Sequence, residues 1–462
     1  MADVNRVVVV GGGPGGYEAA LVAAQLGADV TVVDTDGVGG SAVLTDCVPS
    51  KTLIATAELM ADMEEAHELG IRFEGSLIAE LGRVNTRVKG LALAQSSDIE
   101  RRLTREGVRV LRARGRLDGP QRVVATPAGG GAEETVEADA ILIATGAAPR
   151  TLGSAQPDGE RILTWEQVYD LDEVPERLVV VGSGVTGAEF ASAYNALGVD
   201  VTLVSSRDRV LPGEDADASE VLEDVFKRRG MTVLSKSRMA SVSRQGEAVT
   251  VTLTDGRTVE GSHCLLALGS VPNTGDTGLE EAGVTLGDGG FVTVDRVSRT
   301  SARSVYAAGD CTGVLMLASV AAMQGRIAMW HFLGDAVAPL DLRTVSSNVF
   351  TAPEIATVGW TQNAVDAGEI EAETVMLPLS GNARAKMQGV RDGFVKLFAR
   401  PGTGIVVGGV VVGPRASELI HPVAIAVSQN LTADQLAHAF TVYPSMSGSV
   451  AEAARRLHRF RS

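Results

Sequence analysis

The chain has 462 residues, which is too many for one ordinary hydrophobic core and therefore predicts several domains. Its formal net charge of -16 argues against nucleic acid or an anionic membrane as partners, because long-range repulsion would oppose both. Three widely separated cysteines without a C-x-x-C motif, and six scattered histidines, argue against a zinc or iron-sulfur site. The sequence starts without a charged and apolar signal segment, and no apolar run reaches the roughly 20 residues of a spanning helix. We therefore expect a cytoplasmic protein with no membrane insertion.

The first element is a β-branched strand from Arg6 to Val10, followed by a glycine-rich turn and a helical segment from Tyr17 to Leu26. A second strand, Asp29 to Val33, ends in Asp34, which is placed to accept a hydrogen bond from a ribose hydroxyl. Three glycines between strand and helix have the spacing of a dinucleotide fingerprint: Gly11, Gly13 and Gly16. Bare backbone at these positions lets a pyrophosphate approach the positive end of the helix.

The same unit recurs in the middle of the chain. Leu178 to Val181 predicts a strand, Ala188 to about Leu197 a helix, and Val201 to Val204 a second strand. The glycines of the turn again have the fingerprint spacing: Gly182, Gly184 and Gly187. The repetition predicts two nucleotide sites in one chain.

Other segments lie between and beside these two strand-turn-helix units. Ala140 to Ala144 is an apolar strand that ends in Thr145-Gly146, and the run through Gly269 closes the second unit in a similar way. Met60 to Ala113 has helical spacing with many charges and predicts a long surface helical excursion. Gly129 to Gly131 is expected at a hairpin tip, and Cys264 in the hydrophobic core.

Past residue 273 the pattern of the first unit returns. Val305 to Asp310 is a strand that ends in glycine and an acid, although an acid after a strand can also be a simple helix cap. From about Leu342 onward, strands such as Gly393 to Phe398 and Ile405 to Val412, followed by helices, predict a separate domain.

The segment from Gly39 to Lys51 resembles the redox-active segment of the flavoprotein disulfide reductases, the family of glutathione reductase and dihydrolipoamide dehydrogenase. In that family two cysteines five positions apart open a helix beside the flavin and form a disulfide. Here the second cysteine is present as Cys47, and the first position holds Ala42. One sulfur cannot close a disulfide, so the resemblance implies a disulfide reductase fold without the disulfide.

The resemblance covers essentially the whole chain and implies an α/β fold with two Rossmann-like dinucleotide-binding domains and a C-terminal α+β interface domain. The implied FAD-binding domain is discontinuous, at 1–146 and 271–341, with an NAD(P)-binding domain at 147–270 and a dimerisation domain at 342–462. The implied assembly is a homodimer, and the implied cofactors are FAD with NADPH or NADH.

The resemblance also implies which residues bind the cofactors. In this family Asp310 would bind the ribityl chain, and the backbone near Leu317 and Ala318 would approach the isoalloxazine ring. The full set of cofactor-binding candidates is Gly11, Gly13, Gly16, Asp34, Gly39, Gly40, Lys51, Gly115, Thr145, Gly146, Asp310, Leu317, Ala318, Gly182, Gly184, Gly187, Ser205, Arg207 and Gly269. In NADH-selective relatives this strand ends in an acid, whereas here Val204 is followed by Ser205, and Arg207 close by could accommodate a 2'-phosphate, which favours NADPH with NADH still usable. Arg207 and Arg209 could equally be solvated surface charges.

Four residues are candidates for the chemistry: Lys51, Glu189, Tyr443 and Cys47. In the family the lysine pairs with a glutamate near the flavin, and the positive charge favours hydride acceptance. Cys47 stands at a helix start, where a thiolate is stabilised, or is a small buried hydrophobe. Tyr443 and Gly448 replace the histidine and glutamate with which the partner subunit would manage thiol protons, and a phenol donates a hydrogen bond but is a poor base.

These departures imply a flavoprotein that passes hydride from NAD(P)H through FAD directly to a small acceptor, most plausibly a quinone. The motif set is similar to that of the actinobacterial lipoamide-dehydrogenase-like quinone reductases. Three alternatives stay open: a soluble pyridine-nucleotide transhydrogenase, a peroxidase that uses Cys47 through a sulfenic acid, and a flavin-bearing redox sensor with slow turnover.

Overall fold

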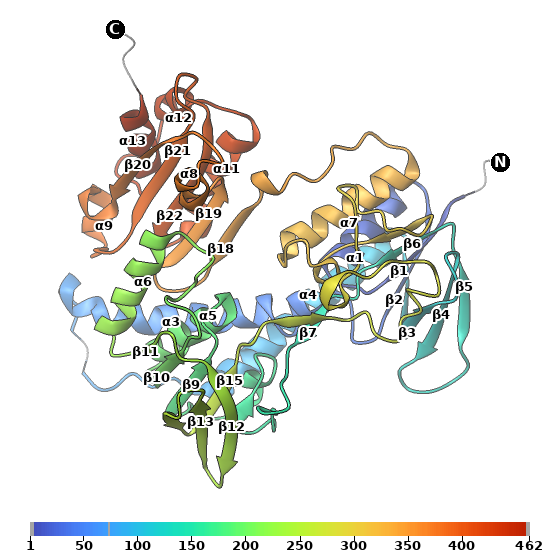
Figure 1. Ribbon diagram of the computed structural model, residues 1–462, viewed down its shortest axis with the longest axis horizontal. Helices are drawn as coiled ribbons and strands as arrows, with labels where there is room; N and C mark the ends of the chain where they lie inside the picture. The colour runs from blue at the N-terminus through green and yellow to red at the C-terminus, as the bar shows by residue number, and fades with distance from the viewer. Residues whose placement is uncertain (1–3, 73, 459–462) are drawn as a thin grey trace. The chain divides into compact units, whose positions relative to one another are not determined.

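The computed structural model describes residues 4–72 and 74–458, and these divide into two compact units (Figure 1). The first unit comprises the described parts of Met1–Ser50, Asn85–Arg150 and Gly269–Asp341. The second comprises those of Lys51–Val84, Thr151–Leu268 and Leu342–Ser462. Within the described ranges, no helix is both long and apolar enough to cross a membrane.

The first unit is built on a seven-stranded sheet with the order β17-β6-β1-β2-β3-β4-β5. The pairs among β17, β6, β1, β2 and β3 are parallel, and β4 and β5 add an antiparallel edge. The strands are β1 (Arg6–Val10), β2 (Asp29–Asp34), β3 (Arg109–Leu117), β4 (Arg122–Pro127), β5 (Glu134–Glu137), β6 (Ala140–Ile143) and β17 (Val305–Ala307). A separate antiparallel ribbon pairs β7 (Ala147–Pro149) with β16 (Ser270–Pro272).

Both faces of this sheet are covered, which explains the continuous apolar run of β1. Val7 and Val9 belong to the core cluster that contains helices α1 and α7, whereas Val8 and Val10 belong to the cluster on the opposite face. Helices α1 and α7 pack against each other over the sheet (Figure 1). The helical segments that begin in this unit or include part of it are α1 (Pro14–Gln25), α2 (Gly40–Leu44), α3 (Cys47–Glu65), α4 (Leu81–Arg105), η3 (Asp288–Gly290), η4 (Asp310–Thr312) and α7 (Ala318–Leu333).

The second unit repeats the nucleotide-binding topology in a five-stranded parallel sheet with the order β11-β10-β9-β15-β8. Its strands are β8 (Ile162–Leu163), β9 (Arg177–Val181), β10 (Asp200–Val204), β11 (Thr232–Leu234) and β15 (His263–Leu266). Cys264 in β15 is fully buried in the core, as predicted. The unit also holds η1 (Ala66–Leu69), η2 (Gln167–Asp170), α5 (Val185–Ala196) and α6 (Ala216–Arg228), and an antiparallel sheet of β12 (Met239–Gln245), β13 (Ala248–Leu253) and β14 (Thr258–Gly261).

The C-terminal part of the second unit is an antiparallel sheet with the order β18-β19-β22-β21-β20. Every residue of β21 and β22 is buried, because helices cover the sheet. The strands are β18 (Ser346–Val349), β19 (Glu354–Gly359), β20 (Glu373–Pro378), β21 (Phe394–Ala399) and β22 (Val406–Gly413). The helical segments are η5 (Leu342–Thr344), α8 (Gln362–Asp366), η6 (Leu379–Gly381), α9 (Ala383–Met387), α10 (Ala416–Leu419), α11 (His421–Ser428), α12 (Ala433–His438) and α13 (Gly448–Leu457).

The prediction of one helical excursion from Met60 to Ala113 is wrong at its C-terminal end. The segment contains the end of α3, η1 and α4, but from Arg109 onward it is the strand β3. From Arg112 to Leu117, exposed arginines alternate with buried small or apolar residues, which is the two-residue period of a strand. The hairpin predicted at Gly129–Gly131 is confirmed, because this turn joins β4 to β5.

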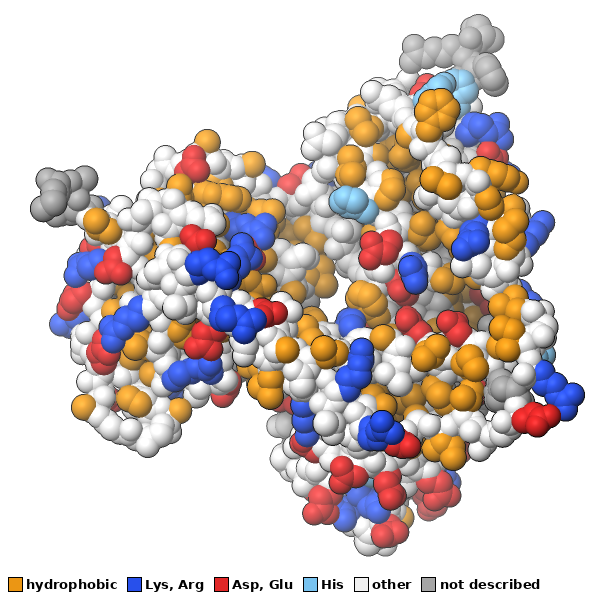
Figure 2. Space-filling view, turned by 180° about the vertical axis from the view of Figure 1, so that it is seen from behind, with side chains coloured by type: hydrophobic (Ala, Val, Ile, Leu, Met, Phe, Trp, Pro, Cys, Tyr) orange, Lys and Arg blue, Asp and Glu red, His pale blue; other side chains and the backbone are white. Residues whose placement is uncertain are grey.

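Basic and acidic side chains are intermingled on the face of the molecule shown in Figure 2. The excess of acidic residues is therefore not concentrated in one patch on that face.

Candidate functional site

Two glycines of the first fingerprint are required by the fold itself. Gly11 has a φ of 104°, and a Cβ there would lie 2.2 Å from the Ala144 carbonyl oxygen. A Cβ on Gly16 would lie 1.9 Å from the Gly11 carbonyl oxygen. Any side chain at either position would break the close contact of the turn with strand β6 or with the first turn of α1.

The middle glycine of the fingerprint has a different environment. Gly13 caps the N-terminus of α1 with φ -67° and ψ -176°, a conformation open to any residue. A Cβ on Gly13 would meet only the Gly40 Cα, at 3.9 Å. Neither the backbone nor the packing therefore requires glycine, and the bare backbone leaves the helix N-terminus open to a phosphate group.

The second fingerprint reproduces this division of roles. Gly182 has a φ of 111°, with a Cβ position 2.1 Å from the Ala267 carbonyl oxygen, and the Cβ position of Gly187 is 1.8 Å from the Gly182 oxygen. Gly184 caps α5 with φ -72°, and its Cβ position has nothing within 4 Å. Both turns thus fit a dinucleotide pyrophosphate at an uncrowded helix N-terminus.

Three further predicted residues join the first fingerprint. The Gly39 N–H donates to the Gly12 carbonyl oxygen at 2.7 Å, and a Cβ on Gly40 would lie 2.7 Å from the Gly13 Cα. Asp34 accepts hydrogen bonds from the backbone N–H groups of Gly12 at 2.6 Å, Gly37 at 2.7 Å and Asp36 at 3.0 Å. The Asp34 carboxylate therefore organises the loop at the end of β2, at the place where the sequence predicts a ribose contact.

Other predicted cofactor residues lie at the carboxyl ends of strands in the same unit. Asp310 follows β17, and burial, with a contribution from Asp46, raises the pKa of its carboxyl group to about 6. Thr145 and Gly146 follow β6, and their carbonyl oxygens accept hydrogen bonds from Asn273 at 3.0 Å each. Gly269 instead directly precedes β16, and its carbonyl oxygen accepts from the Arg150 N–H at 2.9 Å.

Leu317 and Ala318 start helix α7, as its N-cap and first residue. Gly115 lies inside β3, and a Cβ there would stand 2.8 Å from Cγ1 of Val10. Close packing against the Val10 side chain of β1 and the Val33 side chain of β2 is thus sufficient to explain this glycine.

Cys47 is the first residue of α3, as predicted, and is half-buried. Ala42 lies in α2 just before it. The other two cysteines, Cys264 and Cys311, are fully buried in β15 and η4, and none of the three forms a disulfide. Burial raises the pKa of the Cys311 thiol to about 11, which keeps it protonated at neutral pH.

Lys51 and Glu189, whose pairing the family resemblance implies, form an ion pair with 2.9 Å between Lys51 Nζ and Glu189 Oε2. The Glu189 side chain on α5 is only 4% exposed, whereas that of Lys51 on α3 is 30% exposed. The second carboxylate oxygen, Oε1, accepts from the Phe350 N–H at 2.9 Å, and the Phe350 ring centroid is 4.9 Å from Lys51 Nζ. Phe350 was not identified from the sequence, because it lies 161 positions from Glu189 and nothing near it in the sequence indicates the contact.

The end of β10 carries the residues predicted to choose the nicotinamide nucleotide. Ser205 is fully buried, with its hydroxyl 2.6 Å from the Ser183 hydroxyl of the fingerprint turn. The Ser205 hydroxyl also accepts from the Arg207 N–H at 3.1 Å. Ser205 therefore holds the turn together, and Arg207 presents an exposed side chain beside it.

Tyr443 lies in the segment between α12 and α13 and is 87% exposed. Phe440 and Val442 in the same segment are also strongly exposed. The structure thus does not bring Tyr443 together with other predicted site residues of its unit.

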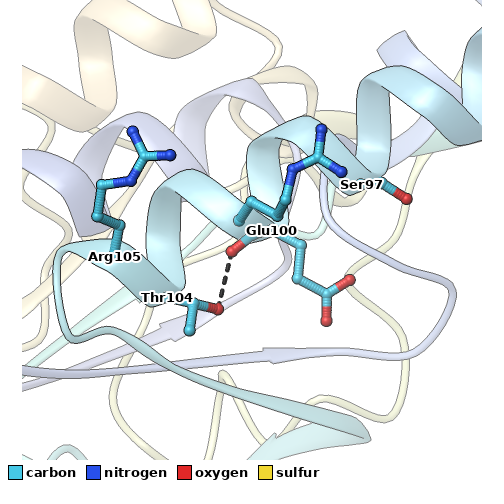
Figure 3. Close-up of a pocket in the computed structure, with 5 residues that line it drawn as sticks. Ser97, Glu100, Thr104 and Arg105 are labelled. Carbon is cyan, nitrogen blue, oxygen red and sulfur yellow. Dashed lines mark hydrogen bonds between the residues drawn. The ribbon is translucent and has the colours of Figure 1, made fainter.

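A surface pocket elsewhere contains none of the predicted residues. It lies along α4 and is lined by Ser97, Glu100, Arg101, Thr104 and Arg105 (Figure 3). The Thr104 hydroxyl donates to the Glu100 carbonyl oxygen of the same helix, and the Glu100 carboxylate pairs with Arg112 of β3, so these polar groups have partners within the fold.

Residues 5–325 match the family model of pyridine nucleotide-disulphide oxidoreductases, and residues 345–454 match the dimerisation domain of that family. The chain is 58% identical to a protein of Mycobacterium tuberculosis named NAD(P)H dehydrogenase (quinone), over 98% of this chain and 94% of the relative. It is 33% identical to a dihydrolipoyl dehydrogenase of Zymomonas mobilis, over 98% of this chain and 97% of the relative.

The fold also matches solved structures. A crystal structure of LpdA from Mycobacterium tuberculosis superposes with a TM-score of 0.95 at 57% identity, covering 99% of this chain and 100% of that one. The HOCl-induced flavoprotein disulfide reductase RclA of Escherichia coli shares the fold at 22% identity, with a TM-score of 0.87 over 97% of this chain and 99% of that one. Together with the two fingerprints, these matches show that the chain belongs to the pyridine nucleotide-disulphide oxidoreductase family, whose members are flavoproteins that use FAD and NAD(P)H.

Proposed function

We propose that the chain is an FAD-dependent NAD(P)H dehydrogenase that passes electrons to a small acceptor, a quinone, and does not reduce disulfides. The observation that carries the proposal is Ala42, a methyl group at the position where the disulfide reductases have their first redox cysteine. The two remaining cysteines, Cys264 and Cys311, are fully buried and therefore poor substitutes for the missing partner of Cys47. The name of the relative that is 58% identical supports the quinone as acceptor.

The domains follow from the proposal. FAD binds residues 1–146 and 271–341, the nicotinamide nucleotide binds 147–270, and residues 342–462 pair two subunits in a homodimer. The match of residues 345–454 to a dimerisation domain supports the last assignment. In the first unit, the open turn at Gly13 receives the pyrophosphate of FAD, and Asp34 and Asp310 bind its hydroxyl groups. In the second, the open turn at Gly184 receives the nicotinamide nucleotide.

Bound FAD supplies the redox chemistry, accepting electrons from NAD(P)H and releasing them to the acceptor. The chain contributes the Lys51 ammonium, which is paired with Glu189 and stabilises negative charge as it develops. Cys47 is not required for turnover. Tyr443 serves the partner subunit as a hydrogen-bond donor in place of a base.

Anaerobic titration of the FAD-loaded protein with NADPH tests the proposal directly. With the flavin as the only redox centre, we expect full reduction after about two electrons per subunit, read from the flavin spectrum. Uptake of four electrons would reveal a second redox group and contradict the proposal.

Turnover assays complete this test. Cys47→Ser should retain quinone reduction, whereas a peroxidase that uses the thiol would lose its activity. Efficient reduction of lipoamide or oxidised glutathione would remove the basis of the proposal. Rapid transfer from NADPH to a thio-analogue of NAD, without quinone, would favour transhydrogenation instead.

The exposed Arg207 is expected to bind the 2'-phosphate of NADPH. Arg207→Ala should raise the KM for NADPH about 10-fold and leave the KM for NADH nearly unchanged, since a charge-assisted hydrogen bond contributes about 1.5 kcal/mol or more. Steady-state kinetics with both nucleotides measure the ratio. Arg177→Ala, at an exposed arginine that starts β9 at the end opposite the fingerprint turn, is the matched control. Equal changes for both nucleotides would show that Arg207 does not read the phosphate.

A further inference from the structure

Phe350 touches both members of the Lys51–Glu189 pair, through two different groups. Its backbone N–H donates to Glu189 Oε1 at 2.9 Å, and its ring faces the Lys51 ammonium with 4.9 Å between Nζ and the ring centroid. All three residues belong to the second unit. Phe350 directly follows strand β18, more than 150 residues along the chain from Glu189.

The N–H contact fixes the orientation of the carboxylate. A buried carboxylate is costly unless its oxygens are hydrogen-bonded, and the Glu189 side chain is almost entirely buried. Lys51 occupies Oε2, and the Phe350 N–H occupies Oε1. Because the two donors approach different oxygens, the carboxylate plane cannot rotate without losing one charge-assisted hydrogen bond.

The ring limits the movement of the ammonium. Lys51 has a long, flexible stem and is partly exposed, so one ion pair alone would leave its charge several alternative positions in water. The face of an aromatic ring attracts a cation within about 6 Å of its centroid, with a free energy of about 0.5–2 kcal/mol. The Phe350 ring thus favours the position of Nζ in which Glu189 also holds it.

The segment that carries Phe350 is itself fixed on helix α5. The Ala352 N–H donates to the Ser192 hydroxyl at 3.1 Å, and Arg229 donates to the Ala352 carbonyl oxygen at 3.4 Å. Glu189 and Ser192 are three residues apart on α5 and so share one face of the helix. The segment after β18 is thereby attached at two points of that face, which sets where the Phe350 ring lies.

We propose that Phe350 is a positioning residue, which holds the Lys51 ammonium in its working place through its ring and orients the Glu189 carboxylate through its N–H. The inference rests on the role of Lys51 in the proposed function. It adds one residue, Phe350, which contacts the Lys51–Glu189 pair. Phe350 acts through Lys51 and Glu189 and is given no contact with substrate.

The test measures flavin reduction by NADPH in anaerobic stopped-flow experiments on the FAD-loaded protein, which needs no acceptor. Phe350→Leu keeps the N–H and an apolar side chain but removes the ring. We expect the limiting rate constant to fall about 5-fold, the equivalent of about 1 kcal/mol of cation–π interaction. Phe350→Tyr keeps the aromatic face and should restore most of the rate. FAD content and thermal unfolding temperature control for damage to the fold.

A double-mutant cycle with Lys51→Met separates positioning from simple packing. In the Lys51→Met background no ammonium is left to hold, so Phe350→Leu should have no further effect on the rate constant. An equal 5-fold loss in both backgrounds would overturn the inference, as would an unchanged rate for Phe350→Leu alone. If Lys51→Met reduces the rate and Phe350→Leu does not, only the inference about Phe350 fails. If Lys51→Met leaves the rate unchanged, the role of the ion pair in the proposed function fails.

Discussion

Replacing Glu189 with alanine is expected to slow the reduction of bound flavin by NADPH by about 100-fold, the order of magnitude observed when one preorganised electrostatic group is removed from an active site. The substitution takes away the acceptor of the Lys51 ammonium and of the Phe350 N–H together. Lys51 would then move toward water and carry its charge away from where negative charge develops. Stopped-flow absorbance of the flavin under anaerobic conditions measures the rate constant.

The conservative variant Glu189→Gln divides this effect into two parts. Its amide oxygen can still accept from the Phe350 N–H, but the side chain has no charge to hold the ammonium. We therefore expect a loss smaller than that of Glu189→Ala but still clear. Glu220→Ala, on the exposed side of α6 in the same unit, is the control for removing a negative charge. If wild type and Glu189→Ala have equal rate constants of flavin reduction, the ion pair has no role in the proposed function.

Lys396→Met is expected to reduce the free energy of unfolding by about 3–5 kcal/mol, the cost of leaving a buried charge without its partner. Lys396 in β21 is 2% exposed, and its Nζ lies 2.8 Å from both carboxylate oxygens of Asp215. Asp217 is a second partner, at 2.5 Å. Because Asp215 also caps helix α6 by accepting from two backbone N–H groups, the loss would extend to the start of that helix. Chemical denaturation at neutral pH measures the change.

A surface lysine provides the matched comparison. Lys227 on α6 also has two acidic partners, Glu223 and Asp224, but is 59% exposed, so Lys227→Met should change the unfolding free energy by no more than about 1 kcal/mol. Adding Asp215→Asn to Lys396→Met removes the unpaired charge but keeps a capping side chain, and should recover part of the stability. If Lys396→Met and Lys227→Met unfold at the same denaturant concentration, the buried ion pair contributes no net stability.

Features with a local cause could be predicted from the sequence. A glycine that avoids a steric clash within its own strand-turn-helix unit, such as Gly16 or Gly187, follows from geometry within a few residues, and both turns have the expected form. The start of α3 at Cys47 has a similar local cause, since Pro49 is compatible with a first helical turn. The pairing of Lys51 with Glu189 came from the resemblance to a family, and the structure places them in contact.

Features with a distant cause could not be predicted in this way. The ion pair of Lys396 with Asp215 joins residues 181 positions apart, and nothing near either residue indicates its partner. Phe350 likewise contacts the Lys51–Glu189 pair from a position 161 residues after Glu189. The error at Arg109 has another origin. Helical spacing and many charges over Met60 to Ala113 suggested a surface helix. From Arg112 onward, however, arginines alternate with Ala113, Gly115 and Leu117, which is the pattern of a strand with one exposed face.

At the middle glycines of the two fingerprints, Gly13 and Gly184, the stability of the fold does not depend on the residue that controls how closely a phosphate can approach. No neighbouring atom crowds the missing methyl group of Gly184, and only one distant contact borders that of Gly13. A small side chain there would leave the folded chain as stable as before and change only how closely a phosphate can approach. Cofactor affinity in each half can therefore evolve, or be engineered, without a compensating change elsewhere in the protein.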